Sequence, residues 1–442
     1  MSPRIFFALA LIALCPRAGA FAPISFDHAV SAYENGNHAE ARIAFERMAE
    51  AGMPEAQFNL GVMWLNGEGG PVDRVKAALW IDTASGAGYQ PASQARDTVV
   101  GVLDDEQRAE FVSQRQDWTR EHSLQALFQR HRARPCSDEC SSAADADAGT
   151  TDPAGIPPTR ITAGHTSEPL QLSIDGRQVY IDRIAPSYPR RATERGIMGV
   201  VRLGGWIRPD GALEQPHVIG ADPRGYFEEE ALRAWKQWSF KWAEDEAPSS
   251  PIYITQRIVF ALEGEQVQGQ TMRDISTAVE RADEDPEAAY RALWMVEQFE
   301  LPFADEVAVE AKTSVINQAA MEGVRRAQID LARRLAYGHD VEQDRAAAIF
   351  WLKQAAFEGQ AEAQFELARW KTLDPSFRAD LLHAAVTGGF LPAVLWQIRS
   401  ALDANEPDRD YVASLLDQLP REWRNRRDDA VIAQAHRIAS GD

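Results

Sequence analysis

The pattern of apolar and polar residues changes twice along the chain. In residues 21–134 and 268–442, apolar and small residues recur three and four positions apart, which predicts amphipathic helices. In residues 170–263, apolar residues alternate with polar ones, which predicts strands. Residues 135–169 contain many Ser, Ala, Asp, Thr, Gly and Pro and few large apolar residues, so we expect a flexible linker. The pattern therefore predicts a multidomain α+β protein in which two helical regions flank a small sheet domain.

The two helical regions contain the same repeat. A window that starts at Gly52 aligns without a gap with one that starts at Gly323, and each runs 36 residues to a second glycine. The small residues at helical spacing predict pairs of antiparallel helices that pack closely. One pair cannot bury its own apolar face, so we expect stacked pairs to form an α-solenoid with a concave surface. The matched pairs are Gly52/Gly323, Ala56/Ala327, Gln57/Gln328, Leu60/Leu331, Gly61/Ala332, Gly67/Gly338, Asp73/Asp344, Trp80/Trp351, Ala84/Ala355 and Gly88/Gly359.

This pattern resembles the Sel1-like repeat, a relative of the tetratricopeptide repeat. A shorter unit that starts at Gly359 recurs at Gly389, and residues 22–51 fit a preceding partial unit. Residues 272–320 are helical in composition but off-pattern, so we interpret them as degenerate repeats. We expect the tryptophans and leucines of the repeat to form its core, and they therefore predict architecture rather than activity.

The alternation in the central segment predicts hairpins, one helix and a final strand. Asp-Gly at 175–176 and Pro-Asp-Gly at 209–211 are typical hairpin turns. A helix with one apolar face follows from Phe227 to Trp238. In the last strand we expect an inward set of Ile252, Ile254, Ile258, Phe260 and Leu262 and an outward set of Tyr253, Thr255, Arg257 and Val259.

The central segment resembles the TonB carboxy-terminal domain across about residues 180–263. Three features depart from that family: Ala185 replaces a usual glutamine, Trp242 replaces a usual proline, and the hairpin at 170–181 is extra. The resemblance implies a short helix and an antiparallel three-stranded sheet whose last strand lies at an edge. It is carried by Pro186-Ser187-Tyr188-Pro189, Arg190-Arg191-Ala192, Gly196, Gly199, Asp210-Gly211, Phe227, Ala231, Leu232 and Trp238-Ser239-Phe240.

A TonB-type domain implies recognition by strand addition, in which the periplasmic peptide of an outer-membrane receptor pairs with the edge strand. Unpaired backbone N–H and C=O groups give affinity, and alternate side chains give selectivity. A structural interpretation of the Pro-Ser-Tyr-Pro run is the alternative: the prolines enter a helix and Tyr188 packs on the sheet. The candidate peptide-binding residues are Pro186, Tyr188, Pro189, Tyr253, Thr255, Arg257 and Val259.

The first residues are typical of an export signal. A basic head, an apolar run from Ile5 to Cys15 and a small-residue site at 18–20 predict a cleaved signal peptide over residues 1–20. The run is too short to span a bilayer. We expect a periplasmic protein, with an inner-membrane anchor as the alternative. In an oxidising compartment, Cys136 and Cys140 predict a small disulfide loop, because a metal site would need two more ligands.

The net charge and the absence of catalytic motifs argue against nucleic-acid binding and against enzyme activity. The 442-residue chain carries a formal charge of −20, which argues against nucleic acid as a partner. The sequence contains no His-Glu-x-x-His motif, no Gly-x-Ser-x-Gly elbow and no phosphate loop, so we predict no enzyme activity, cofactor, metal site or small-molecule substrate.

These observations predict a non-catalytic adaptor or scaffold whose partners are proteins or peptides. A TonB-dependent outer-membrane receptor is the candidate partner. Two alternatives stay open: a TonB-type energy transducer component of outer-membrane transport, and a pure repeat scaffold. The oligomeric state is also open, because an exposed edge strand can pair with its twin.

Overall fold

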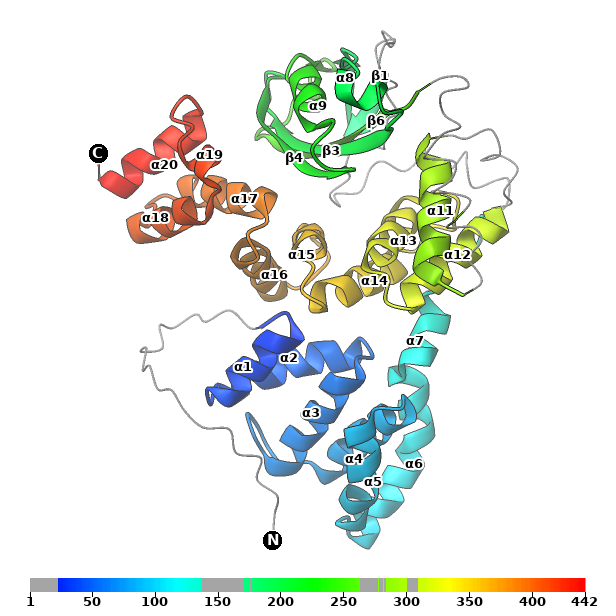
Figure 1. Ribbon diagram of the computed structural model, residues 1–442. Coiled ribbons are helices and arrows are strands. Elements are labelled where there is room, and N and C mark those ends of the chain that lie inside the picture. The colour runs from blue at the N-terminus through cyan, green and yellow to red at the C-terminus, as the bar shows by residue number, and fades with distance from the viewer. Residues whose placement is uncertain are drawn as a thin grey trace.

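The computed structural model describes residues 23–136, 170–174, 176–262, 277, 281, 284–299 and 309–441. The predicted signal peptide, most of the predicted linker and Cys140 lie outside the described residues. Figure 1 shows three parts: N-terminal helices, a sheet domain, and C-terminal helices that lie between the other two.

The helices follow the predicted division of the chain. The two units that the sequence aligns are α3–α4 and α13–α14. The N-terminal helices are α1 (Phe26–Glu34), α2 (His38–Glu50), α3 (Pro54–Asn66), α4 (Arg74–Gly86), α5 (Gln90–Gly101), α6 (Asp105–His122) and α7 (Leu124–His131). The C-terminal helices are α11 (Pro286–Phe299), α12 (Val309–Met321), α13 (Arg325–Tyr337), α14 (Arg345–Phe357), α15 (Ala361–Ala368), α16 (Pro375–Thr387), α17 (Leu391–Leu402), α18 (Arg409–Gln418), α19 (Arg421–Arg424) and α20 (Ala430–Ser440).

The aspartates and glycines that recur in the repeat begin and end its helices. Asp73 and Asp344 are N-caps, and each carboxylate accepts a hydrogen bond of 2.9 Å from the backbone N–H three residues later. Gly67 and Gly338 end the preceding helices in the left-handed region, with φ of 72° and 70°. The repeat therefore specifies where each helix begins and ends.

The recurring glutamines tie each helix to the one before it. Gln57, Gln328 and Gln364 are buried, and each side-chain amide donates to the backbone carbonyl eight residues earlier, at 3.2, 3.3 and 3.0 Å. A buried amide needs such a partner, because an unpaired one costs about 1–3 kcal/mol. The glutamine thus fixes the turn between successive helices.

The two helical regions share one hydrophobic core. Phe128 of α7 stacks on Trp351 of α14 with ring centroids 5.3 Å apart, and the Trp351 indole N–H donates to the His131 carbonyl at 2.8 Å. The Gln354 amide donates to the carbonyl of Ala51, which follows α2, at 2.7 Å. The sequence separates these regions by the sheet domain, but in the structure they form a continuous helical layer.

The sheet domain contains two three-stranded antiparallel sheets, where the sequence predicted one. The extra hairpin at 170–181 pairs with a short strand after the helix, and that strand was not predicted. Its four residues alternate polar and apolar side chains, but this is the shortest run that indicates a strand, and it directly follows the apolar face of the helix. The first sheet, in spatial order, is β1 (Leu170–Ile174), β2 (Arg177–Asp182) and β5 (Ser239–Trp242), and the second is β4 (Leu213–Asp222), β3 (Gly199–Ile207) and β6 (Ile252–Phe260). The helices of this domain are α8 (Arg190–Thr193) and α9 (Glu228–Trp235).

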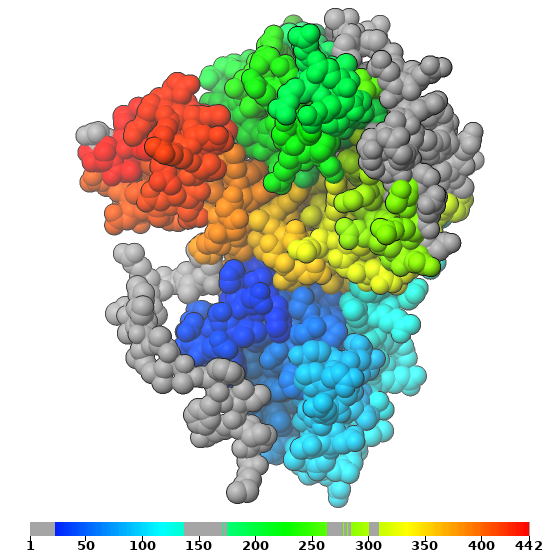
Figure 2. All heavy atoms as spheres, viewed as in Figure 1, coloured from blue at the N-terminus to red at the C-terminus, as the bar shows by residue number. Residues whose placement is uncertain are grey.

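The domain has its own core, formed by one face of each sheet and by α9. Phe227 and Trp235 are fully buried in it, as their helical spacing predicted, and so are Ile254, Ile258 and Phe260 of β6. Figure 2 shows the sheet domain seated on the C-terminal helices, which in turn lie on the N-terminal helices. The second face of the β4-β3-β6 sheet therefore has a neighbour of its own.

Candidate functional site

The longest edge strand without a proline in the described part of the chain is β6. It pairs with β3 over its whole length of nine residues, and no described strand pairs with its other side. The remaining edges are blunted: β1 and β5 have five and four residues, and β4 carries Pro216. The sequence placed the last strand at an edge, and the strand order agrees.

The odd-numbered residues of β6 direct their backbone groups toward this free edge. The Tyr253 carbonyl accepts a hydrogen bond of 3.4 Å from the Arg369 guanidinium, and the Arg257 carbonyl accepts one of 2.9 Å from the Gln256 amide. Alternate residues of an antiparallel strand point to opposite edges, so Thr255 shares this direction. Because Arg369 covers the Tyr253 end, the available ladder runs from residue 255 to residue 259.

The predicted outward side chains of β6 do not face solvent, and this expectation was wrong. Tyr253 and Val259 are 3% and 1% exposed, and the other two members of the set are half-buried. Tyr253 packs against Phe365 of α15 with ring centroids 5.5 Å apart, and Val259 lies in an apolar cluster with Val296 of α11. Alternation along a strand marks its two faces, but it does not tell whether water or a second domain covers the outer one.

An aromatic cluster holds this face of the sheet against the last helices. The rings of Trp206 and Tyr253 lie 4.7 Å apart, and Trp423 of α19 packs edge-on against His217 at 6.1 Å. The Arg399 guanidinium lies 4.6 Å from the Trp206 ring. His217 is 1% exposed, and its Nε2 lies 3.2 Å from the Tyr253 hydroxyl. Burial lowers the pKa of His217 to about 4, so this histidine is neutral at pH 7.

A row of charges crosses the same face. Arg202 of β3 binds Glu362 of α15 through both guanidinium nitrogens, and Arg333 of α13 donates to the same carboxylate at 2.7 Å. Burial opposes the ionisation of Glu362, but the two guanidiniums hold its pKa well below its usual range. Arg257 lies directly opposite Arg202 in the β3–β6 register, and burial lowers its pKa. The Arg257 Nε is buried and has no hydrogen-bond partner.

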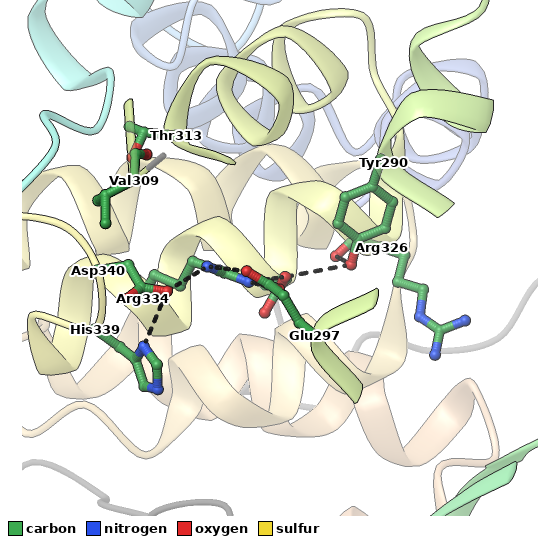
Figure 3. Close-up of polar contacts among 9 residues, drawn as sticks. Tyr290, Glu297, Val309, Thr313, Arg326, Arg334, His339 and Asp340 are labelled. Atoms are coloured by element: carbon green, nitrogen blue, oxygen red, sulfur yellow. Dashed lines mark hydrogen bonds and ion pairs between the residues drawn. The ribbon is translucent and has the colours of Figure 1, made fainter. Parts of the chain in front are cut away.

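A second cluster of charges, shown in Figure 3, lies between α11 and α13. Arg334 binds Glu297 at 3.2 Å, Asp340 at 3.3 Å and Asp330 at 3.5 Å. The Tyr290 hydroxyl lies 3.4 Å from Asp330. Burial opposes the charge on Arg334, but the surrounding carboxylates raise its pKa well above the usual range. This cluster fixes α11 in the position from which it contacts β6.

Tyr188 and its flanking prolines occupy structural positions. The Tyr188 hydroxyl donates to the Ile197 carbonyl at 2.7 Å, and its ring packs edge-on against Phe227 and Phe260. Burial raises the pKa of Tyr188 far above its ordinary value. Pro186 is buried, and Pro189 is the N-cap of α8. These contacts match the structural alternative, and they leave the role of these three residues in peptide binding as a proposal.

Cys136 is disulfide-bonded. Its predicted partner, Cys140, lies outside the described residues. The backbone N–H of Cys136 donates to the Asp340 carbonyl at 3.2 Å, and Pro135 forms an isolated bridge with Val341. The disulfide therefore adjoins the point where the segment after α7 is fastened to the C-terminal helices.

A cavity of about 460 Å³ lies where the sheet domain meets α11 and α13. Its walls are mainly apolar, with Trp294 and Met198 among them, and Arg326 spans its rim by binding Asp222 at 2.8 Å. Within the described ranges, no three His, Cys, Asp or Glu side chains are grouped to hold a metal ion.

Comparison with known proteins finds matches to two families. Residues 184–262 match the family described as the Gram-negative bacterial TonB protein C-terminal, and residues 54–89 and 325–358 match the Sel1 repeat. The chain thus contains one segment similar to the TonB C-terminal domain and two segments similar to the Sel1 repeat. Among the helices of the described residues, none has the length and hydropathy needed to span a bilayer.

Several curated proteins are similar to about a fifth to a quarter of this chain. "Protein TonB" of Klebsiella pneumoniae is 31% identical over 117 residues, which are 26% of this chain and 45% of that protein. "Protein TonB" of Escherichia coli K12 is 31% identical over 84 residues, which are 19% of this chain and 33% of that protein. The chain thus spans less than half the length of these relatives. A solved protective antigen of uropathogenic Escherichia coli with an SLR fold aligns at 15% identity over 94% of this chain and 84% of its own, with a TM-score of 0.21, too low to support an argument.

Several residues that define the site were not identified from the sequence. Arg369 and Glu362 reach β6 and β3 from the C-terminal helices, and no local pattern in the sequence links them to the sheet. Trp206 gave a usable signal, because a tryptophan stands at an expected solvent position between the core residues of β3. Such a residue indicates a covered face.

Proposed function

We propose that this protein is a periplasmic, non-catalytic adaptor whose TonB-type domain binds an extended peptide by strand addition along β6. The observation that carries the proposal is the nine-residue, proline-free edge of β6, which no described strand occupies. The family of the domain supports a place in the cell envelope and a protein partner. A periplasmic segment of a TonB-dependent outer-membrane receptor is the candidate ligand.

Few backbone groups of β6 are available to a peptide, and their number limits what they contribute to peptide affinity. Thr255 and Val259 each offer an N–H and a C=O, while Arg257 offers its N–H because Gln256 already binds its carbonyl. At roughly 1 kcal/mol for each net hydrogen bond, these five groups contribute about 5 kcal/mol before the entropy of ordering the peptide. That corresponds to a Kd of order 0.1–1 mM. Side-chain contacts must supply the rest of a useful affinity and the selectivity.

The repeats have different roles in this proposal. The C-terminal helices hold the sheet domain in place through the aromatic cluster and the charged row, so that surface is not open to another protein. The N-terminal helices pack on these helices from the side away from the sheet (Figure 2), and we assign the scaffold role to the outer surface of α3 to α6. The peptide-binding edge is thereby presented at a fixed angle to the scaffold.

The direct test uses N-methylated peptides with the full mature chain. Nine-residue peptides from the periplasmic segments of TonB-dependent receptors are made in pairs, with backbone N-methyl groups on odd residues in one and on even residues in the other. Strand addition predicts that methylation of one set, odd or even, abolishes binding and that methylation of the other set leaves binding nearly unchanged. The reason is that alternate N–H groups of the peptide face away from β6. Equal effects of the two sets, or no binding by any unmethylated peptide, would contradict the proposal.

A protein variant supplies the complementary test. Thr255→Pro removes an N–H that points to the free edge and spares the ladder to β3, so it should abolish peptide binding while the melting temperature stays near that of the wild type. Thr255→Val is the matched control, because it keeps the backbone donor and a strand-forming side chain. Binding that survives Thr255→Pro in a folded protein would show that the peptide does not add to β6.

A further inference from the structure

Arg257 is the one residue of β6 whose charge the described structure leaves without a bonded partner. No hydrogen bond or ion pair joins its guanidinium to any residue that the structure describes, and its Nε is enclosed by other atoms. A half-buried guanidinium without a bonded partner costs free energy, and a carboxylate supplied by a ligand would offset that cost. Arg257 lies in the middle of the free ladder, between Thr255 and Val259.

The neighbouring strand shows what completes an arginine on this face. Arg202 is the register partner of Arg257 and is bound by the two carboxylate oxygens of Glu362. Arg202 and Arg257 thus lie side by side on adjacent strands. A carboxylate of the described residues is bound to Arg202, and none is bound to Arg257.

The acidic residues closest to Arg257 do not fill this place. Glu297 and Asp330 attract Arg257 at longer range, but both carboxylates are bound to Arg334. An oxygen of Asp330 also accepts a hydrogen bond of 3.4 Å from the Tyr290 hydroxyl. Arg333, the other cation near Arg257, is bound to Glu362 and Glu366. These groups form a closed network that does not include Arg257.

We propose that the residue an added peptide places beside Arg257 is an aspartate or a glutamate. The inference rests on the proposed function and names the chemistry of its ligand: an extended peptide with a carboxylate on the side that faces the C-terminal helices. Residues directly opposite on adjacent strands have Cβ atoms about 4.5–5.5 Å apart, so either carboxylate reaches the guanidinium. Arg257 is thus a specificity-determining residue of the edge.

The test is a position scan with a defined probe. Nine-residue peptides of alternating Thr and Val carry a single Asp at each position in turn, with Asn at the same position as the uncharged control, and are titrated into the full mature chain. One position is expected to bind about tenfold or more tightly with Asp than with Asn, as for a partly desolvated charge pair. Arg257→Gln should abolish that difference while the Asn peptide keeps its affinity, and Arg257→Glu should transfer the preference to a Lys peptide.

The outcomes separate this inference from the proposed function. If only one set of N-methyl groups abolishes binding but Asp and Asn bind equally at every position, strand addition stands and the carboxylate inference is overturned. If a preference for Asp persists in Arg257→Gln, another cation binds the peptide carboxylate, and the inference is overturned as well. If a receptor-derived peptide binds but no Asp peptide of the scan does, strand addition stands and the carboxylate inference is overturned. The melting temperatures of Arg257→Gln and the wild type are compared, and a bonded role inside the fold would lower that of the variant.

Discussion

Trp206→Ala should separate the sheet domain from the C-terminal helices without unfolding the sheet domain itself. Trp206 is 3% exposed and belongs to the cluster shared with α15 to α20, and it is absent from the domain's own core. Its ring packs 4.7 Å from Tyr253 and 4.6 Å from the Arg399 guanidinium. Truncation of a fully buried tryptophan costs about 3–5 kcal/mol. Here the loss should weaken the contact between the sheet domain and the C-terminal helices.

Differential scanning calorimetry and limited proteolysis measure the effect. The wild type should melt in a transition that couples the sheet domain to the C-terminal helices, and Trp206→Ala should split it into two. Trp235→Ala, which opens a cavity in the core of the sheet domain, should instead abolish the transition of that domain. Tyr180→Ala, at a side chain that is 44% exposed, should change stability by less than about 0.5 kcal/mol. An unsplit transition and a loss below about 1 kcal/mol for Trp206→Ala would refute the docking model.

Three further predictions follow from particular contacts. Burial depresses the pKa of His217 from 6.5 to about 4, so between these pH values the undocked state binds a proton that the docked state does not. The free energy of unfolding should therefore be highest above pH 6.5, fall toward pH 4 and level off after a loss of about 3 kcal/mol. The urea midpoint of His217→Gln should not show this dependence on pH. Trp351→Phe removes the indole bond to His131 and should cost about 1–2 kcal/mol in urea unfolding, more than Trp80→Phe at the matching repeat position, and an equal cost at both would contradict the role of that bond. Iodoacetamide should leave Cys136 and Cys140 unlabelled until a reductant is added, whereas labelling of the exported protein without reductant would contradict the predicted disulfide.

The repeats and the edge strand were predictable because both depend on the spacing of apolar residues within a short segment. The helical spacing around Ala56 and Ala327 and the alternation from Ile252 to Phe260 report directly on which residues are buried. The recurring Asp73 and Asp344, which the sequence aligns as one repeat position, are both N-caps in the structure. These features depend on neighbours within one helix pair or one strand.

The docking of the sheet domain was not predictable from the same patterns. Tyr253 and Arg257 occupy alternate positions whose pattern would be the same if they faced solvent. Their neighbours on the helices lie far along the chain: Arg369 is 116 positions from the Tyr253 carbonyl that it binds. Such a contact depends on the path of the whole solenoid, which no local signal encodes. The second sheet was missed for a related reason, since β5 becomes a strand through pairing with the hairpin at 170–181.

Residue-resolved hydrogen exchange of the backbone amides of β6, in the full chain with and without peptide, shows whether the outer edge of this strand is unpaired until a peptide adds to it. We expect fast exchange at Thr255, Arg257 and Val259 in the free protein, slow exchange at Ile254 and Ile258, and protection of the first three when peptide binds. Slow exchange at all five amides in the free protein, unchanged by any peptide, would contradict this expectation.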